Sequence, residues 1–251
     1  ADGAVITGSN GKGSTAAMLA SILRETGEGV GLFTSPHLLR LNERFKLDGE
    51  DIADDELDAH WRKAAAAIDA WHGNGGAQVG GFEFLFLIAA SWFAARGCRY
   101  TVWEAGIGGR YDPVRLIQAR RTALTSLDLE HTALLGDTLE GIARDKIDAA
   151  PAGATAFVSE SCLPQRAPIE AHAQEREINA RFVPALASAP LPGSHQMQNA
   201  ALAVALARDM ASFRDEQVAR GLAATRWPGR LEIISEVPLV VIDVGHTPEA
   251  I

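Results

Sequence analysis

Short apolar runs alternate along this chain with longer segments in which apolar residues recur every three or four positions. The short runs predict strands at residues 4–7, 30–33, 100–104, 122–126 and 154–158. The longer segments predict helices at residues 14–25, 54–71, 82–96, 138–149, 196–211 and 215–224. This alternation predicts an α/β fold, in which a mostly parallel sheet is covered by helices on both faces.

Glycine, proline and polar residues interrupt the pattern. Residues 72–76 (His-Gly-Asn-Gly-Gly) predict a flexible break between two helices, and the polar residues 159–181 predict no regular element. Residues 226–229 (Arg-Trp-Pro-Gly) end a helix before the mostly apolar run 237–242. We therefore predict one domain at residues 1–226, and a hinge with the beginning of a second α/β domain at residues 227–251. Because a strand begins almost at Ala1 and a motif is barely complete at Ile251, we expect the natural chain to be longer.

Composition narrows the function classes. The 251 residues are enough for one large domain and part of a second. A formal net charge of −9 excludes the basic stripe that a nucleic-acid-binding protein needs. The longest apolar run, at residues 84–95, is too short to span a bilayer. Only Cys98 and Cys162 are present, which suits a reducing compartment. We expect a cytoplasmic protein with neither nucleic-acid nor membrane partners.

The first predicted strand runs directly into Gly-Ser-Asn-Gly-Lys-Gly-Ser-Thr, residues 8–15, and a helix follows. Glycines let the backbone bring N–H groups close to an anion, and the new helix points its positive end at the same place. Lys12 would reach the β- and γ-phosphates of a nucleotide, and Ser14 or Thr15 would face a magnesium ion. The usual pattern has Ser or Thr directly after the lysine, whereas here Gly13 intervenes. This spacing indicates a particular ATP-using subgroup; the alternative is a glycine-rich turn with an exposed lysine.

Two candidate metal ligands follow the next predicted strands. Ser35, in Thr-Ser-Pro-His-Leu at residues 34–38, offers an oxygen ligand, although Ser-Pro in a loop is more often a simple turn. Glu104 ends a strand beside the glycines of residues 106–109, where a carboxylate is well placed to hold magnesium on an ATP phosphate. The alternative for Glu104 is an acid at a buried edge, paired with Arg110.

A third group of polar residues lies between residues 128 and 146. We predict that His131 ends a strand and ligates a metal through neutral imidazole. Asp137 or Thr138 would cap the following helix, which presents Lys146 two turns along. A lone histidine is more often structural and a helix lysine commonly faces water, so neither residue would be selected in isolation.

The last polar candidates lie near the end of the chain. Asn199 offers an amide for a base or ribose, Arg230 a planar fork for phosphate, and Asp243 an acceptor for ribose hydroxyls. Each alone is compatible with a cap or a turn. They become informative together, through the order in which they follow the glycine-rich loop along the chain.

That order resembles the Mur ligase superfamily and, within it, the folylpolyglutamate synthase/dihydrofolate synthase branch. The resemblance covers nearly the whole chain and rests on residues 8–14, 34–38, 42–45, 82–84, 104–110, 131–136, 195–199 and 228–230. The glycine spacing at residues 8–14 is typical of this family. The resemblance implies a Mur-ligase-like central ATP-binding domain at residues 1–226, followed by the start of a second, Rossmann-like α/β domain.

The resemblance also implies a reaction between small molecules. ATP would phosphorylate the carboxylate of a folate or dihydropteroate acceptor to an acyl phosphate. The amine of an incoming amino acid, glutamate in this branch, would then attack it to give an amide, ADP and phosphate. We expect the protein to be a monomer.

Residue roles are carried over from the same resemblance. ATP would be bound by two groups of residues, from the first loop and from the hinge and second domain: Asn10, Gly11, Lys12, Gly13, Ser14 and Thr15, then Asn199, Arg230, Asp243 and His246. Catalysis would involve Lys12, His131 and Lys146, of which Lys146 falls where the family has a carbamylated lysine. One magnesium ion would be held by Ser14, Ser35 and Glu104, and His131 would help to hold a second.

The chain departs from the family pattern mainly in loops expected to contact the acceptor. Residues 113–115 are Pro-Val-Arg where the family commonly has Ala-Thr-Asn, and residues 147–149 are Ile-Asp-Ala where it has Ala-Gly-Ile. Glu130 replaces an aspartate, and residues 243–248 read Asp-Val-Gly-His-Thr-Pro in place of Asp-Gly-Ala-His-Asn-Pro. Two alternatives therefore stay open: a diverged ligase that joins a different carboxylate and amine, and a nucleotide-binding protein without ligase activity.

Overall fold

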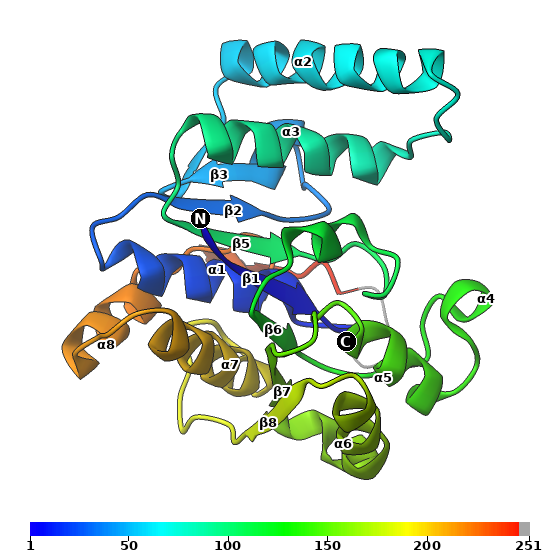
Figure 1. The fold of residues 1–251 in the computed structure, drawn as a ribbon. Coiled ribbons are helices and arrows are strands. Elements are labelled where there is room, and N and C mark those ends of the chain that lie inside the picture. Colours follow the sequence, from blue (N-terminus) through cyan, green and yellow to red (C-terminus); the bar gives the residue numbers. More distant parts are fainter. Residues whose placement is uncertain (246–251) are drawn as a thin grey trace.

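An eight-stranded sheet organises the protein, in the order β4-β3-β2-β5-β1-β6-β7-β8 (Figure 1). The computed structural model describes residues 1–245. Strands β2, β5, β1, β6, β7 and β8 run parallel, and the β3–β4 edge is antiparallel. The predicted α/β class with a mostly parallel sheet is confirmed. The strands of this sheet are β1 (Asp2–Thr7), β2 (Val30–Phe33), β3 (Phe45–Leu47), β4 (Glu50–Asp51), β5 (Tyr100–Glu104), β6 (Arg121–Leu124), β7 (Thr155–Ser159) and β8 (Asn179–Val183).

Helices cover both faces of the sheet. Alternate residues of each strand point to opposite faces, so Ile6 packs into the core beneath α1, α7 and α8, whereas Val5 packs beneath α3. A third apolar cluster, which includes Val158, lies beneath α5 and α6. The helices are α1 (Lys12–Arg24), α2 (Asp54–Gly73), α3 (Gly81–Ala95), α4 (Thr132–Leu135), α5 (Leu139–Ile147), α6 (Arg166–Glu175), α7 (His195–Met210) and α8 (Asp215–Ala223). Short 3-10 turns occupy Leu41–Arg44 (η1), Pro113–Ile117 (η2) and Glu160–Gln165 (η3).

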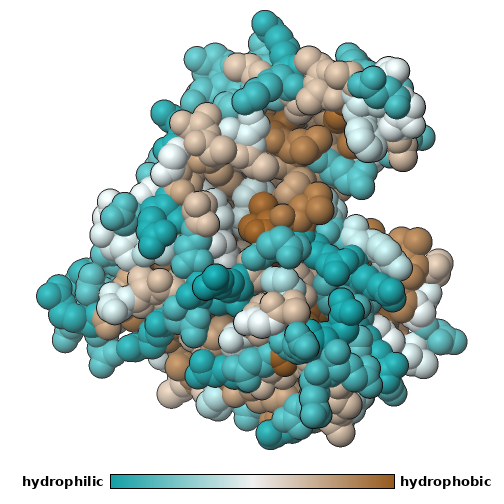
Figure 2. Space-filling model, viewed as in Figure 1, coloured by the Kyte–Doolittle hydropathy of each residue, from teal (hydrophilic) through white to brown (hydrophobic). Residues whose placement is uncertain are grey.

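Helix α2 lies outside the layer that touches the sheet. It packs on α3, and Ala64 is its one buried residue (Figure 1). The predicted break at residues 72–76 is where the chain turns from α2 into α3. Figure 2 shows a hollow in the surface between the α2–α3 pair and the lower part of the molecule, with apolar side chains along it.

The prediction of no regular element at residues 159–181 is wrong. This segment contains η3, α6 and the start of β8. α6 buries only Ile169 and Ala173, which lie four residues apart, and most of its other residues are polar. β8 is the edge strand of the sheet and none of its residues is fully buried. Both elements form because they pack on α5 and β7. Such packing leaves no apolar period in a mostly polar sequence, so the sequence pattern does not predict them.

Strands β9 (Glu232–Glu236) and β10 (Leu239–Ile242) form a separate antiparallel pair that does not join the large sheet. β10 falls within the predicted apolar run 237–242, and each of its four residues is exposed. Within the described residues, no helix has the length and apolar character that crossing a membrane requires.

Candidate active site

The glycine-rich loop lies at the carboxyl end of β1, in the middle of the sheet, where open α/β folds bind ligands. α1 begins at Lys12, two residues before the predicted start. Gly11 caps it at φ 84°, a backbone conformation that favours glycine, and a Cβ there would stand 2.3 Å from Asn199 Oδ1. The first turn of α1 therefore presents its positive end in a tightly enclosed loop, which is suited to binding a phosphate.

Gly13 has a partner more than two hundred residues away in the chain. A Cβ at Gly13 would lie 2.8 Å from a ring carbon of Trp227. The indole therefore rests on the first turn of α1, at a distance that only a residue without a side chain allows. The glycine that interrupts the common lysine-serine spacing is required by this contact.

The Lys12 ammonium lies folded back over the same loop. Its Nζ donates hydrogen bonds to the carbonyl oxygens of Gly8 at 2.8 Å and Ser9 at 3.0 Å. Ser14 lies in the same turn, and its hydroxyl accepts a hydrogen bond from Gln196 Nε2. Thr15 is fully buried, and within residues 1–245 its hydroxyl has no hydrogen-bond partner.

Two cavities flank the N-terminus of α1. The first, which we call the α7 cavity, has a volume of about 240 Å³. It lies between the glycine-rich loop, the segment after β6 and the start of α7, and its lining includes Asn10, Gly11, Ser14, Asn199, Arg230 and Asp243. The structure therefore brings most of the predicted nucleotide-binding residues to one cavity.

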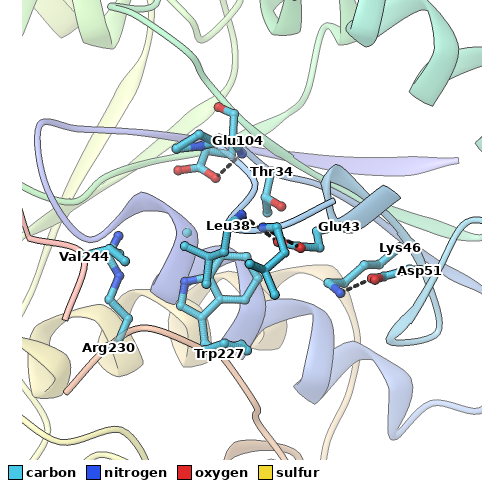
Figure 3. Close-up of a pocket in the computed structure, with 14 residues that line it drawn as sticks. Thr34, Leu38, Glu43, Lys46, Asp51, Glu104, Trp227, Arg230 and Val244 are labelled. Atoms are coloured by element: carbon cyan, nitrogen blue, oxygen red, sulfur yellow. Dashed lines mark hydrogen bonds and ion pairs between the residues drawn. The ribbon is translucent and has the colours of Figure 1, made fainter. Parts of the chain in front are cut away.

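The second, the Trp227 cavity, has a volume of about 360 Å³ and lies on the other side of the loop (Figure 3). Its middle is apolar, with Leu38 facing Trp227, and Glu104 lies at its inner end (Figure 3). Arg230 lines both cavities. Arg230 Nε is buried and has no hydrogen-bond partner among the described residues, so a ligand that accepts this N–H would satisfy it.

Glu104 is the buried acid of this site. Its side chain is 3% exposed, and its Oε2 accepts the Ser35 backbone N–H at 2.9 Å. Burial raises the pKa of Glu104 to about 7, against the opposing effects of Lys12, the Ser35 N–H, Arg230 and Arg44. Arg110 instead pairs with Asp148 at 3.9 Å, so the alternative pairing of Glu104 with Arg110 is not found.

These residues fit a divalent cation. Burial opposes the ionisation of Glu104, so a positive charge placed beside it would stabilise the ionised carboxylate. Thr34 and Ser35, which carry hydroxyl groups, line the same cavity. Within residues 1–245, however, no three His, Cys, Asp or Glu side chains form a metal-binding group. A magnesium ion here would therefore take its remaining ligands from hydroxyls, water and phosphate oxygens.

Lys146 is buried, contrary to the common position of a helix lysine in solvent. It is 1% exposed in α5, and its Nζ donates to Glu130 Oε1 at 2.7 Å. Burial lowers the pKa of Lys146, and the nearby charge of Lys12 lowers it further, although Glu130 opposes both. Of the two predicted caps of α5, the structure shows Thr138, whose hydroxyl accepts the Gly141 N–H.

His131 does not end a strand, which corrects that prediction. β6 ends at Leu124, and His131 is the exposed residue at φ 46° that precedes α4. It lines neither the α7 cavity nor the Trp227 cavity. The structure thus places Ser14, Ser35 and Glu104 around the glycine-rich loop but does not bring His131 to them.

Two of the nucleotide-side residues are held in place by hydrogen bonds to neighbouring positions. Asn199 is 4% exposed and its Nδ2 donates to Gln196 Oε1 at 3.0 Å. Asp243 accepts the backbone N–H of Leu231 at 2.9 Å and lines the α7 cavity. His246 lies outside the described residues.

Sequence reasoning assigned no role to two positions that hold the site together. Gln196 is buried and joins Ser14 of α1 to Asn199 of α7. Asp145 in α5 accepts the Gly109 N–H at 2.8 Å and so fixes the glycine loop that follows Glu104. Gln196 lies within the motif at residues 195–199, which is a usable signal, whereas the contact of Asp145 depends entirely on the fold.

A third cavity, the Tyr111 cavity, has a volume of about 400 Å³ and lies between α3 and residues 110–116. Arg110 and Arg115 are among its lining residues. Pro113 and Arg115, from the segment that departs from the family pattern, are also among its lining residues.

Similar proteins were found by sequence and by structure. A probable bifunctional folylpolyglutamate synthase/dihydropteroate synthase of Halobacterium salinarum is 35% identical over 271 residues, which is 98% of this chain but 33% of that protein. The apo form of L. casei FPGS (folylpolyglutamate synthase) has a TM-score of 0.92 and 30% identity, and the match covers 99% of this chain and 68% of that one.

The chain belongs to the folylpolyglutamate synthase/dihydrofolate synthase family of Mur ligases. A Yersinia pestis member, solved with AMPPNP and Mn ion, has a TM-score of 0.87 and 31% identity, covering 99% of this chain and 63% of that one. Other solved members hold AMPPCP with folate, or Mn, AMPPNP and L-glutamate. No protein-family model matches the chain. The chain spans about a third of the length of the Halobacterium relative.

Proposed function

We propose that this protein is an ATP-dependent ligase that joins glutamate to the carboxylate of a folate or dihydropteroate through an acyl phosphate. One observation carries the proposal. The glycine-rich loop lies between two cavities that share Arg230, so a nucleotide in one cavity and a carboxylate in the other would meet at the phosphate-binding turn. Relatives solved with AMPPCP and folate, and with Mn, AMPPNP and L-glutamate, support the choice of substrates.

In this proposal the α7 cavity takes ATP. Asn199 and Asp243 face its base and ribose, and the first turn of α1 binds the phosphates. Lys12 exchanges its two carbonyl partners for phosphate oxygens, which are stronger acceptors because they are charged. Asn10, Gly11, Gly13, Ser14 and Thr15 shape this turn. His246 follows Asp243 in sequence and is proposed to contact the nucleotide as well.

The acceptor carboxylate would enter the Trp227 cavity. Its oxygen attacks the γ-phosphorus, the bond to the β-phosphate oxygen breaks, and ADP leaves. The amine nitrogen of glutamate then attacks the acyl carbon, the bond from that carbon to the phosphate oxygen breaks, and the amine loses a proton. Lys12 and Arg230 neutralise charge that develops on the transferred group, and the site otherwise acts by positioning.

Magnesium, when bound, would neutralise phosphate charge and orient the γ-phosphoryl group. Glu104, Ser35 and Ser14 are the residues proposed to hold it. A second ion with His131 as a ligand would require the segment that contains His131 to approach the loop. We propose that Lys146 is the lysine that becomes carbamylated, since burial lowers its pKa and so favours the neutral amine that this modification needs.

A second candidate function is favoured by residues 113–115. Arg115 brings a cationic side chain to the Tyr111 cavity, in the segment where the family commonly has an uncharged Ala-Thr-Asn, and Arg110 lines the same cavity. A ligase of the same mechanism that acts on a different carboxylate would use such a departure to select its acceptor. A screen of carboxylate and amine pairs for ADP release separates the two, because selectivity for a non-pterin acid favours the second.

We also propose that residues 1–226 form the ATP-binding domain and that residues 227–251 form the hinge and the start of a second α/β domain. The separation of β9 and β10 from the large sheet supports this boundary. The monomeric state and the cytoplasmic location stay predictions.

The proposal is tested with the full-length protein that contains this chain. Dihydropteroate or reduced folate is incubated with ATP, magnesium and glutamate, and the products are identified by mass. Lys12→Ala should abolish formation of the ligated product, whereas Lys63→Ala, which removes an exposed lysine of α2, should leave it unchanged. Absence of product from a folded wild-type protein would reject the proposed reaction, and wild-type turnover in Lys12→Ala would reject the role of Lys12.

A further inference from the structure

The loop from Ser35 to Arg40 joins β2 to η1 and forms one wall of the Trp227 cavity. It contains no helix or strand, yet the Glu43 carboxylate fixes three consecutive backbone groups in it. Oε2 accepts the N–H of Leu38 at 2.7 Å, and Oε1 accepts those of Leu39 at 2.9 Å and Arg40 at 2.7 Å. Hydrogen bonds to an ionised acceptor are the stronger kind, so this one side chain determines the path of the loop.

The turn that carries Glu43 is itself anchored. Asn42 Nδ2 donates to the Ile52 carbonyl and to Asp54 Oδ1, both at 2.8 Å, which ties η1 to the residue after β4 and to the start of α2. Arg44 Nε donates to His37 Nδ1 at 2.9 Å, and the Arg44 carbonyl accepts the Thr34 N–H at 3.0 Å. Glu43 therefore holds the loop against a fixed support.

The loop presents apolar side chains to the cavity. Leu38 is 45% exposed and Leu39 is 89% exposed, and both line the Trp227 cavity. Leu38 faces Trp227 across the cavity in Figure 3, while hydrogen bonds run from the loop backbone to Glu43. An apolar side chain held in a fixed position and left uncovered gains free energy when a ligand covers it.

We propose that Glu43 is a positioning residue for the acceptor: it holds Leu38 and Leu39 opposite Trp227, so that the flat apolar body of a carboxylate substrate binds between them. This inference rests on the proposed function. Glu43 itself lines the cavity, and in this proposal its role is to hold the loop rather than to act on the reacting atoms. It acts on acceptor affinity through the loop, and the nucleotide in the α7 cavity does not depend on it.

Glu43→Gln is the informative variant. The amide keeps one acceptor oxygen but turns two N–H donors toward a site already filled with N–H donors, so at least one loop amide loses its partner. The acceptor KM should rise about tenfold, while kcat and the dissociation constant for an ATP analogue change less than about twofold. Glu50→Gln removes an exposed carboxylate on β4 and is the matched control, expected to leave the acceptor KM unchanged.

A double-mutant cycle distinguishes positioning from general loosening. If Glu43 acts through the loop leucines, Glu43→Gln combined with Leu38→Ala should raise the acceptor KM hardly more than the larger single effect. Hydrogen exchange at the amides of residues 38–40 should be faster in Glu43→Gln. The proposal would be overturned if the two single substitutions raised the acceptor KM by factors that multiply in the double mutant. It would also be overturned if Glu43→Gln showed faster exchange at these amides but an unchanged acceptor KM.

Calorimetric binding of folate to the AMPPCP-loaded protein separates this inference from the proposed function. A wild-type protein that binds folate without making product rejects the ligation, and weaker folate binding by Glu43→Gln would then still support the positioning role. If the wild-type protein makes the ligated product and Glu43→Gln has the same acceptor KM, the role of Glu43 is rejected and the ligation is not. A wild-type protein that neither binds nor ligates rejects both.

Discussion

Gly13 and Trp227 touch at the wall of the Trp227 cavity, with a ring carbon 2.8 Å from the place where a Gly13 Cβ would stand. The contact joins the first turn of α1 to the segment that leads into β9. Because the glycine-rich loop and the hinge region meet here, a change at either residue alters both the phosphate-binding turn and the wall of the cavity.

Gly13→Ala should weaken binding of an ATP analogue about tenfold and lower the free energy of unfolding by about 1–3 kcal/mol, since the methyl group must displace the indole. Calorimetry and chemical denaturation measure the two effects. Trp227→Leu in the same protein should restore part of the lost stability by making room for the methyl group. Gly73→Ala, at the exposed end of α2 where a Cβ meets no atom within 4 Å, is the control. Equal effects at both glycines would contradict the argument.

Stability should fall as the pH rises toward 7 because of Glu104. In the unfolded chain this carboxyl loses its proton near its ordinary pKa of 4.5, whereas in the folded protein burial raises the pKa to about 7. Between these values the native state holds the extra proton, so the contribution of Glu104 is most favourable below pH 4.5 and declines up to pH 7, by about 2–3 kcal/mol.

Thermal unfolding of wild type and Glu104→Gln without divalent cations, from pH 4.5 to 8, measures this contribution. The variant should be more stable than wild type above pH 7, and the difference should shrink toward pH 4.5. Added magnesium should stabilise the wild type at pH 8 but not the variant. A constant difference across the pH range would show that Glu104 titrates at its ordinary value.

Carbamylation of Lys146 should require a divalent cation. Glu130 Oε1 lies 2.7 Å from Lys146 Nζ, so replacing the ammonium by a carbamate places two anions together. A metal ion offsets that repulsion. Labelled bicarbonate followed by carbon NMR should detect the carbamate only with magnesium or manganese present. Lys146→Arg keeps the charge for Glu130 and cannot carry the carbamate, so signal in that variant, or in metal-free wild type, would contradict the prediction.

Local patterns in the sequence predict the elements that are apolar along most of their length. β1, β2 and β5 are almost wholly buried in the middle of the sheet, and α1 and α7 cover it with alanine-rich surfaces. α6 and β8 lie at the edge and bury few side chains, so their polar sequence indicates no element. The antiparallel strands β3 and β4 are too short to show a period, and they form by pairing, β3 with β2 and β4 with β3.

The sequence by itself determined that a strand, a glycine-rich loop with Lys12 and a helix come together, because these residues are neighbours and their backbone preferences act locally. Only the tertiary structure decided which surfaces face that loop. It buries Lys146 against Glu130, leaves His131 exposed in a loop, and gathers three amides on Glu43. It also shows why Gly13 must be glycine, because the Trp227 ring packs against it. The two residues are far apart in the chain, so no local sequence pattern indicates this contact.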